Sequence, residues 1–435
     1  MRTSLAVCIC AAAMLVLTGC GYLSPLPPEE PSGPASGSVG EPYRFSTMTT
    51  DPQGDNVAFR FDWGGEYSDW TAFVRSGERV SVGHSWDEAG EYEVRAQARD
   101  MCGFTSDWSD PHGITIGGGQ GGYPDTLVNI IAGIADPVGI APSPDGQFVY
   151  VSARGENRLV VIRTSDDAVL ARVAVGSRPH AVCVLPDGRY AYVANCGSDN
   201  VSVVRLSDNT AVATVPVGNF PIFCTALPNS EYVYVSNYYS GTVSVIRTSD
   251  NTVTATVAVG PNVWGSAATP DGRFVYAGLS GSPQLKIIRT SDNTVSGTVS
   301  VHTGPEGMSI LPGGEYLYVA CRTGGGGPAY IDVVRLSDNT VVASTPVGGY
   351  PVDVVPLPNG QYVYVGCHVS GDIHALSTET RAIAWSQAGA SGPCYIAAPS
   401  NRRVYVCCNF GNEVRVLGMR GRVLPGQGST PVAQN

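Results

Sequence analysis

A few acidic, amide and imidazole side chains could in principle hold a metal ion. His180, Glu306 and Asp353 follow loop segments, and Asn195 and Asn237 end two apolar stretches. Carboxylates, amides and imidazoles around one ion could activate water for hydrolysis. His180, Glu306 and Asp353 are scattered and do not define such a site. The sequence also lacks the G-x-S-x-G, H-E-x-x-H and phosphate-loop motifs. We therefore predict no metal, no cofactor and no catalytic residue.

Cysteine offers two further kinds of chemistry. Cys367, His368 and His374 resemble a metal-binding string, but a strand turn separates the two histidines, and we interpret them as a surface pair. Cys394 opens one apolar stretch and Cys408 ends the next, so antiparallel pairing would bring them near each other. Two readings stay open: a disulfide between Cys394 and Cys408, or two buried thiols acting as small apolar residues.

These residues belong to a repeat. An apolar strand with a central tyrosine recurs at steps of 42, 42, 42, 42, 46 and 41 residues. The marker tyrosines are Tyr150, Tyr192, Tyr234, Tyr276, Tyr318, Tyr364 and Tyr405. Each unit contains four strand-like runs separated by PDG and SDN turns, a period typical of a propeller or solenoid.

The two ends of the repeat region indicate a closed ring. The last unit stops after its third strand, VRVL, at residues 414–417. The segment TLVNIIAGIADP, residues 126–137, aligns with the fourth strand of a unit although no unit precedes it. Pairing of this orphan strand with the last unit would remove both open sheet edges. We predict an all-β, seven-bladed β-propeller closed by its N-terminal strand.

The repeat resembles the YVTN family in PDG, YVAN and VSVVRLSDNTAVATVPVGNFP, which recur in register over about residues 125–417. Upstream, DPQGDNVAFRFDWGG and SWDEAGEYEVRAQARD resemble the PKD-type, immunoglobulin-like β-sandwich. The resemblance implies a smaller sandwich in which Trp63, Trp86 and Tyr92 are core residues. It also implies a role as a spacer or an adhesive unit, which is general for such modules.

Positions that vary between repeats indicate where a ligand could bind. The PDG and SDN turns are alike in most units, so we assign them to the scaffold. The opposite loops differ, and their residues should ring the mouth of the channel. The candidate ligand-binding rim comprises His180, Phe223, Trp264, Glu306, Asp353, Tyr395, Arg154, Tyr238, Arg322 and His368, with Tyr239 and Phe410 beside them. The alternative is that these are ordinary residues packing between blades.

The net charge and the N-terminal sequence indicate which classes of partner and which cellular location to expect. The net charge is −11 and Lys286 is the only lysine, which disfavours nucleic acid. Arg2, the apolar run from Leu5 to Leu17 and the sequence LTGC ending at Cys20 resemble a bacterial lipoprotein signal. The resemblance implies lipidation at Cys20 and a location in the cell envelope, at the outer membrane, the cell surface or the periplasm.

The predicted domain order has six parts. They are a signal peptide at 1–20, a Pro/Ser/Gly-rich spacer at 21–40, the sandwich at 41–116, a Gly-rich linker at 117–124, the propeller at 125–420 and a tail at 421–435.

Two function classes remain. The first is a tethered, non-enzymatic binding or scaffold protein, a monomeric propeller whose variable face contacts an envelope protein or glycan. The alternative is a propeller enzyme, a lactonase-like hydrolase or a cofactor-dependent oxidoreductase, with its site at the channel mouth.

Overall fold

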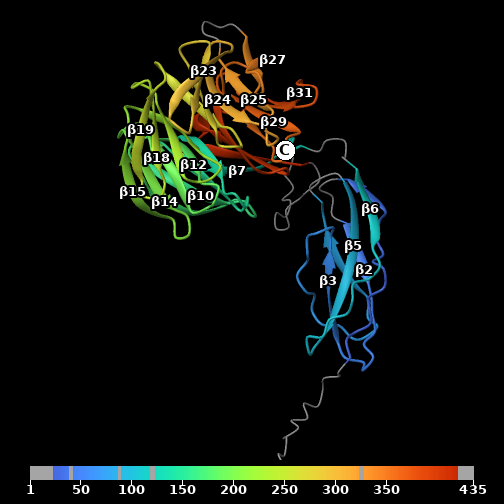
Figure 1. Cartoon of the computed structure of the whole chain (residues 1–435). Coiled ribbons are helices and arrows are strands. Elements are labelled where there is room, and N and C mark those ends of the chain that lie inside the picture. Colours follow the sequence, from blue (N-terminus) through green and yellow to red (C-terminus); the bar gives the residue numbers. More distant parts are fainter. Residues whose placement is uncertain (1–22, 39–42, 87–89, 118–122, 323–327, 420–435) are drawn as a thin grey trace, which may run out of the picture. The chain divides into compact units, whose positions relative to one another are not determined.

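The computed structural model describes residues 23–38, 43–86, 90–117, 123–322 and 328–419. The chain divides into two compact units, residues 1–122 and 123–435, which we describe separately (Figure 1). Apart from one short 3-10 turn, η1 (Asn409–Gly411), the regular elements in these ranges are all strands. None of the described segments forms a helix long and apolar enough to cross a bilayer. The predicted signal peptide and Cys20 lie outside the described residues.

The first unit is a β-sandwich of two sheets, in which every strand pair except β1–β6 is antiparallel. One sheet has the order β1-β6-β5-β3 and the other pairs β2 with β4. The strands are β1 (Ser36–Ser38), β2 (Tyr43–Thr47), β3 (Val57–Asp62), β4 (Val80–His84), β5 (Gly90–Asp100) and β6 (His112–Gly117). Alternating apolar residues of the strands form the core, and Trp63 and Trp86 are 3% and 4% exposed while Tyr92 packs against them. Their predicted place in the core is confirmed.

The prediction of a spacer over residues 21–40 is wrong from Leu26 onward. The backbone N–H groups of Leu26, Glu29 and Ser32 donate to the carbonyls of Thr50, Met48 and Ser46, so this segment lies along the sandwich. Residues 36–38 form β1, which pairs in parallel with β6. Proline removes a donor only at its own position, so a proline-rich segment can still form an edge strand through its other residues.

The second unit is a ring of seven four-stranded sheets, or blades. Blade 1 contains β8 (Pro137–Pro142), β9 (Phe148–Ala153), β10 (Arg158–Arg163) and β11 (Ala168–Ala174); blade 2 contains β12 (Pro179–Val184), β13 (Tyr190–Asn195), β14 (Asn200–Arg205) and β15 (Thr210–Pro216); blade 3 contains β16 (Pro221–Ala226), β17 (Tyr232–Asn237), β18 (Thr242–Arg247) and β19 (Thr252–Ala258); blade 4 contains β20 (Val263–Ala268), β21 (Phe274–Leu279), β22 (Gln284–Arg289) and β23 (Thr294–Ser300).

The remaining blades have the same order. Blade 5 contains β24 (Pro305–Ile310), β25 (Tyr316–Cys321), β26 (Ala329–Arg335) and β27 (Thr340–Val347); blade 6 contains β28 (Pro351–Pro356), β29 (Tyr362–Cys367), β30 (Asp372–Ser377) and β31 (Ile383–Gln387); blade 7 contains β32 (Pro393–Ser400), β33 (Arg403–Cys408), β34 (Glu413–Gly418) and β7 (Thr126–Ala132). The first strand of each blade lies innermost, where it contacts the first strands of its neighbours.

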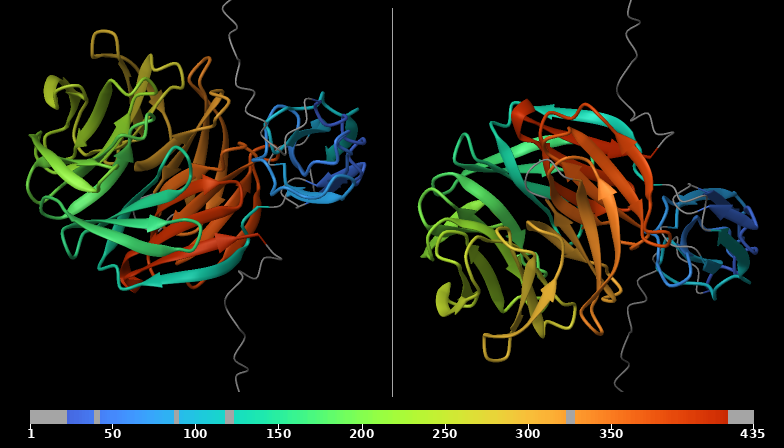
Figure 2. Two further views of the ribbon diagram at one scale, coloured as in Figure 1. Left: turned by 90° about the horizontal axis from the view of Figure 1, so that it is seen from below. Right: turned by 90° about the horizontal axis from the view of Figure 1, so that it is seen from above.

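The ring closes as the sequence predicts. Strand β7 pairs antiparallel with β34, with Ala132 opposite Glu413 and Thr126 opposite Gly418. Figure 2 shows the blades fanned around a centre, with the teal first strand beside the red last blade. The predicted all-β fold, with seven blades and an N-terminal closing strand, is confirmed.

The repeated tyrosine joins neighbouring blades. The hydroxyls of Tyr192, Tyr234 and Tyr276 each donate to an asparagine in the SDN turn of the next blade, at 2.6 Å. The acceptors, Asn251, Asn293 and Asn339, have φ between 55° and 58°, a left-handed conformation that asparagine tolerates well. The two repeated motifs of the sequence therefore form one interblade hydrogen bond.

The joint between the units is shorter than the predicted linker of residues 117–124. Gly117 ends β6, and Tyr123 and Pro124 pack on the propeller, where Pro124 O accepts a hydrogen bond from Tyr364. Residues 118–122 and the predicted tail at 421–435 lie outside the described residues, as do 323–327 of the long loop in blade 5.

Candidate functional site

The innermost strands all begin at one end of the ring, and a left-handed residue precedes each of them. This position has φ between 51° and 72° in every blade. The seven residues are Asp136, Arg178, Phe220, Asn262, Gly304, Tyr350 and Gly392. The geometry turns the chain from the outer strand of one blade into the innermost strand of the next. It also places these residues beside the loops between the second and third strands of each blade. The loops that precede the innermost strands and the loops between the second and third strands therefore share one face.

An aromatic cluster lies across the channel mouth. The His180 ring is T-shaped to the rings of Trp264 and Tyr395, at centroid distances of 6.0 and 5.6 Å. The indole N–H of Trp264 donates to the Tyr395 hydroxyl at 3.2 Å. Phe223 and Tyr238 extend the cluster, 6.1 Å from Tyr395 and 5.5 Å from Trp264. Residues from blades 2, 3, 4 and 7 therefore meet there.

His180 is held in its neutral form. Its Nδ1 lies 2.9 Å from the carbonyl oxygen of Ile222, and because a carbonyl can only accept, Nδ1 carries the hydrogen. Burial, followed by the positive charge of Arg154, lowers the pKa of His180 to about 3. The imidazole therefore serves as an apolar ring with one internal hydrogen bond.

A buried ion pair lies beside this cluster. Arg322 Nε is 2.6 Å from Glu306 Oε1, and its Nη1 and Nη2 donate to Tyr350 Oη at 2.6 Å and Ser280 Oγ at 2.8 Å. The Glu306 carboxyl is fully buried, and burial raises its pKa to about 7 against the opposing charge of Arg322. Burial, followed by Glu306, raises the pKa of Tyr350 to about 12. Glu306 is thus poised to change charge near neutral pH.

The other half of the rim combines a second ion pair with a tilted pair of rings. Arg154 binds Asp136 through two hydrogen bonds of 2.6 and 3.1 Å. His368 Nε2 lies 3.1 Å from Asn409 Oδ1, and its ring lies 4.6 Å from Phe410. Burial lowers the pKa of His368, and the positive charge of Arg154 adds to this effect.

The ten predicted rim residues lie at this end of the ring, where His180, Glu306, Asp353 and Tyr395 are buried and the other six are partly exposed. We call this face, with Tyr239, Phe410, Phe220 and Tyr350, the aromatic rim. Tyr239 and Phe410 are its most exposed rings, at 66% and 67%. Our sequence reasoning missed Phe220 and Tyr350, because it considered the residue after each loop proline and not the one before. The variation of that preceding position between units was the available signal.

Asp353 belongs to the rim but does not join an ion site. Its Oδ2 accepts from the backbone N–H of Ile396 at 3.1 Å, and burial raises its pKa to about 6. Glu306 is engaged by Arg322, and Asn195 and Asn237 bond to neighbouring polar side chains of their own blades. No group of three or more ligating side chains occurs within the described ranges.

The cysteine and histidine readings need correction. Cys394 and Cys408 are free thiols and do not form the disulfide. Pro393 stands opposite Cys408 in the strand pair, so Cys394, one residue on, points to the other face of blade 7. Cys394 packs towards blade 1 and Cys408 towards blade 6. His374 is not a surface residue, being 7% exposed and bonded to Ser386.

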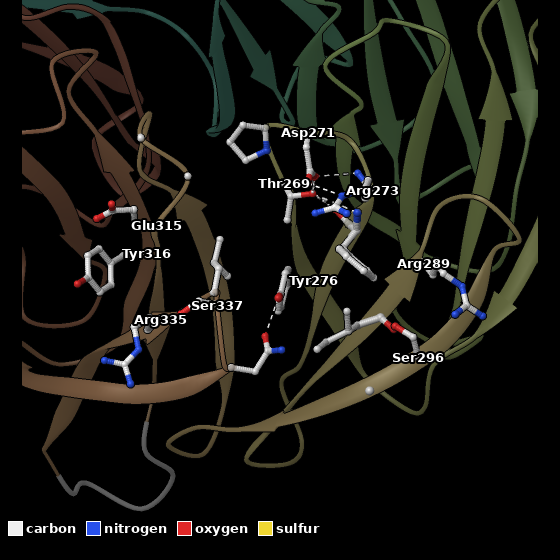
Figure 3. Close-up of a pocket in the computed structure, with 18 of the residues that line it drawn as sticks. Thr269, Asp271, Arg273, Tyr276, Arg289, Ser296, Glu315, Tyr316, Arg335 and Ser337 are labelled. Atoms are coloured by element: carbon white, nitrogen blue, oxygen red, sulfur yellow. Dashed lines mark hydrogen bonds and ion pairs between the residues drawn. The ribbon is translucent and has the colours of Figure 1, made fainter.

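Two grooves open between blades on the opposite face, which the repeats predict to be scaffold. The larger has a volume of about 990 Å³ between blades 4 and 5, and the smaller, of about 510 Å³, lies between blades 1 and 2. Figure 3 shows the larger groove, where Arg273 pairs with Asp271 and Tyr276 bonds to Asn339. Arg289 and Arg335 on its wall are paired with aspartates of their own turns. Four of the five charged side chains that line this groove are therefore engaged within the scaffold, Glu315 being the fifth, and we consider the aromatic rim the stronger candidate.

Comparison with known families identifies both units. Residues 124–214 and 174–326 match the family described as "Lactonase, 7-bladed beta-propeller", and residues 30–110 match the PKD domain. Residues 124–326 are therefore similar to this lactonase-type propeller family, and residues 30–110 are similar to the PKD domain. Both expected folds are therefore confirmed, and the PKD match begins inside the segment that composition predicts to be a spacer. No curated protein matches the chain.

The solved structures support the same fold. The propeller is similar to a chain titled "Kuenenia stuttgartiensis Hydrazine Synthase", with a TM-score of 0.62, 20% sequence identity, and coverage of 70% of this chain and 99% of that one. A match to 752 solved chains shows how widely the fold occurs. Likeness at this identity shows architecture and leaves activity to be argued from the site.

Proposed function

We propose that the propeller is a binding module that contacts a protein partner through the aromatic rim. The observation that carries the proposal is the pair of bulky rings at left-handed positions. Phe220 and Tyr350 have φ of 59° and 63° and are the two aromatic residues at this position, where the other five blades have Asp136, Arg178, Asn262, Gly304 and Gly392. A bulky residue there costs about 1–2 kcal/mol, and such strain is typical of functional positions.

The surroundings of these two rings support a contact role. Phe220 lies 4.7 Å from the exposed Tyr239, and Tyr350 lies 4.9 Å from the guanidinium of Arg322. Tyrosine, tryptophan and arginine dominate the energetics of protein interfaces, because they bury large areas with little loss of conformational entropy. The strained rings therefore extend a surface of the composition that protein partners recognise.

The test uses substitutions that relieve strain while removing the rings. Phe220→Gly should hold or raise the thermal midpoint, whereas Tyr350→Gly should lower it because Arg322 loses an acceptor. Both variants should reduce capture of a partner from solubilised envelope material at least tenfold. Asn262→Gly, at the same backbone position, is the matched control and should change neither. Protease treatment of the extract should abolish capture. Capture that survives protease and is lost after glycan removal would instead assign a glycan, and equal capture by both glycine variants would overturn the proposal.

A propeller enzyme is the second candidate, favoured by Glu306 and the lactonase-type match. A carboxyl with a pKa of about 7 can donate or accept a proton near neutrality. Hydrolysis of a panel of lactones, measured for the wild type and Glu306→Gln, tests this candidate. Turnover lost in Glu306→Gln would support it, whereas no turnover by the wild type would remove it.

We also propose that the protein is exported and tethered by lipid at Cys20, with the PKD domain between the anchor and a monomeric propeller. The supporting observation is the apolar run before LTGC. Cys20→Ser should release the protein from the membrane fraction. Retention of this variant on the membrane would contradict the anchor.

A further inference from the structure

Neighbouring innermost strands face each other at one repeated pair of positions. In blades 3 and 4 these are Thr225, the fifth residue of β16, and Ser266, the fourth residue of β20. The two hydroxyl oxygens are 2.8 Å apart, and Thr225 Oγ1 also donates to the carbonyl of Ser266 at 2.9 Å. The fifth side chain of one strand therefore contacts the fourth of the next across the blade boundary.

Cysteines occupy the same two positions one blade earlier. Cys183 is the fifth residue of β12 and Cys224 is the fourth residue of β16. Both are free thiols in the structure and belong to one core cluster, at 9% and 3% exposure. Cys224 Sγ donates to the carbonyl of Tyr192 at 3.3 Å, and Tyr192 is the cross-strand partner of Cys183. A hydrogen bond to the Cys224 thiol is the largest cause that raises the pKa of Cys183.

We propose that Cys183 and Cys224 form a disulfide that joins blade 2 to blade 3. The two thiols face each other in the place where the next pair of blades has a direct hydroxyl contact. Blades 2 and 3 are separate sheets without a shared hydrogen-bond ladder, and the innermost strands of this boundary are joined by single hydrogen bonds such as that of His180 Nδ1 to the carbonyl of Ile222. The bond would covalently brace one boundary of the ring near the channel.

The oxidant is a second disulfide, either a small-molecule disulfide or a dithiol–disulfide exchange protein. One cysteine thiolate attacks the oxidant, forms a mixed disulfide and releases one oxidant thiol. The other cysteine thiolate then attacks the mixed disulfide, closes the Cys183–Cys224 bond and releases the second thiol. The two protons lost by the cysteines end on the two released thiols. Because both cysteines are buried in the folded ring, the exchange takes place during folding, before blades 2 and 3 pack.

Peptide mapping tests the bond directly. The full chain is unfolded, refolded in a buffer of reduced and oxidised glutathione, alkylated in denaturant and digested. We expect the peptides of Cys183 and Cys224 to be recovered as one species that separates on reduction, while Cys367 is alkylated. Cys367 is the matched control, since its core cluster contains no second cysteine. Quantitative alkylation of Cys183 and Cys224 in the refolded chain would overturn the proposal, whichever other cysteines pair.

A double variant separates the bond from packing. Cys183→Thr with Cys224→Ser copies the neighbouring hydroxyl pair and should fold. Reductant should lower the thermal midpoint of the refolded wild type by several degrees more than that of the double variant, since both proteins keep the disulfide of Cys102. Equal responses of the two proteins to reductant would contradict a bond that stabilises the ring.

Discussion

The hydroxyl of Tyr192 donates to Asn251 Oδ1 at 2.6 Å, joining the second strand of blade 2 to the outer turn of blade 3. The same bond recurs around the ring with instructive exceptions. Tyr364 instead donates to Pro124 O, because blade 7 takes its outer strand from the start of the propeller and has no SDN turn. Tyr405 donates to Asp167 of blade 1, across the closure.

Removing one such hydroxyl should weaken the ring by the value of one hydrogen bond. Tyr192→Phe or Tyr234→Phe should lower the free energy of unfolding by about 1 kcal/mol, because the asparagine carbonyl loses its donor. Tyr318→Phe is the control, since Arg381 replaces asparagine in the facing turn and the described residues provide no hydrogen bond for this hydroxyl. Chemical denaturation measures all three. A loss in Tyr318→Phe equal to that in Tyr192→Phe would contradict this role.

The aspartate at the closure should contribute more than the asparagines elsewhere. Asp167 accepts hydrogen bonds from Tyr405, Arg403 and Asn129, and its side chain is 1% exposed. Asp167→Asn keeps an acceptor for the tyrosine but loses the charge that pairs with Arg403. We expect a loss of about 1–3 kcal/mol, measured by urea unfolding.

The exposed ion pairs of the other turns provide the comparison for Asp167. Asp208→Asn, in the solvent-exposed pair with Arg205, should leave the urea midpoint unchanged. If both variants unfold at the wild-type midpoint, the charge of Asp167 does not contribute to closure.

The innermost strands leave no room for a methyl group at Gly265. A Cβ there would lie 2.0 Å from the carbonyl oxygen of Glu306 in the next blade. Gly265→Ala should therefore cost about 2–3 kcal/mol, because backbone atoms must move apart. Gly313→Ala, where a Cβ would contact nothing within 4 Å, should change stability by less than about 0.5 kcal/mol. The thermal unfolding midpoints of both variants test this prediction. Equal midpoints would contradict a steric requirement for glycine at position 265.

Glu306 should make stability fall as the pH rises. Burial raises its pKa from an ordinary 4.5 to about 7, so between these values the folded state binds more protons than the unfolded state. The contribution of the protonated form is complete below pH 4.5 and is lost as the pH approaches 7, by on the order of 2–3 kcal/mol. Glu306→Gln should remove this slope when unfolding is measured from pH 4.5 to 8. The same slope in both proteins would show that another group is responsible.

Sequence periodicity predicts the architecture well, because each repeat must bury the same strand faces. The seven marker tyrosines, the orphan strand and the ten rim residues all follow from that repetition. Phe220 and Tyr350 were missed because the prediction took the residue after each loop proline and not the variable residue before it. The Cys394–Cys408 reading considered distance along the turn but not the alternation of side chains, which sends the two thiols to opposite faces.

The pairing of β7 with β34 has a consequence for incomplete chains. A polypeptide that ends before β34 cannot close a smaller ring, because the partner strand of β7 is missing. It would instead present two unsatisfied strand edges, which attract other chains. Loss of the last strand should therefore favour association between chains over a smaller closed ring.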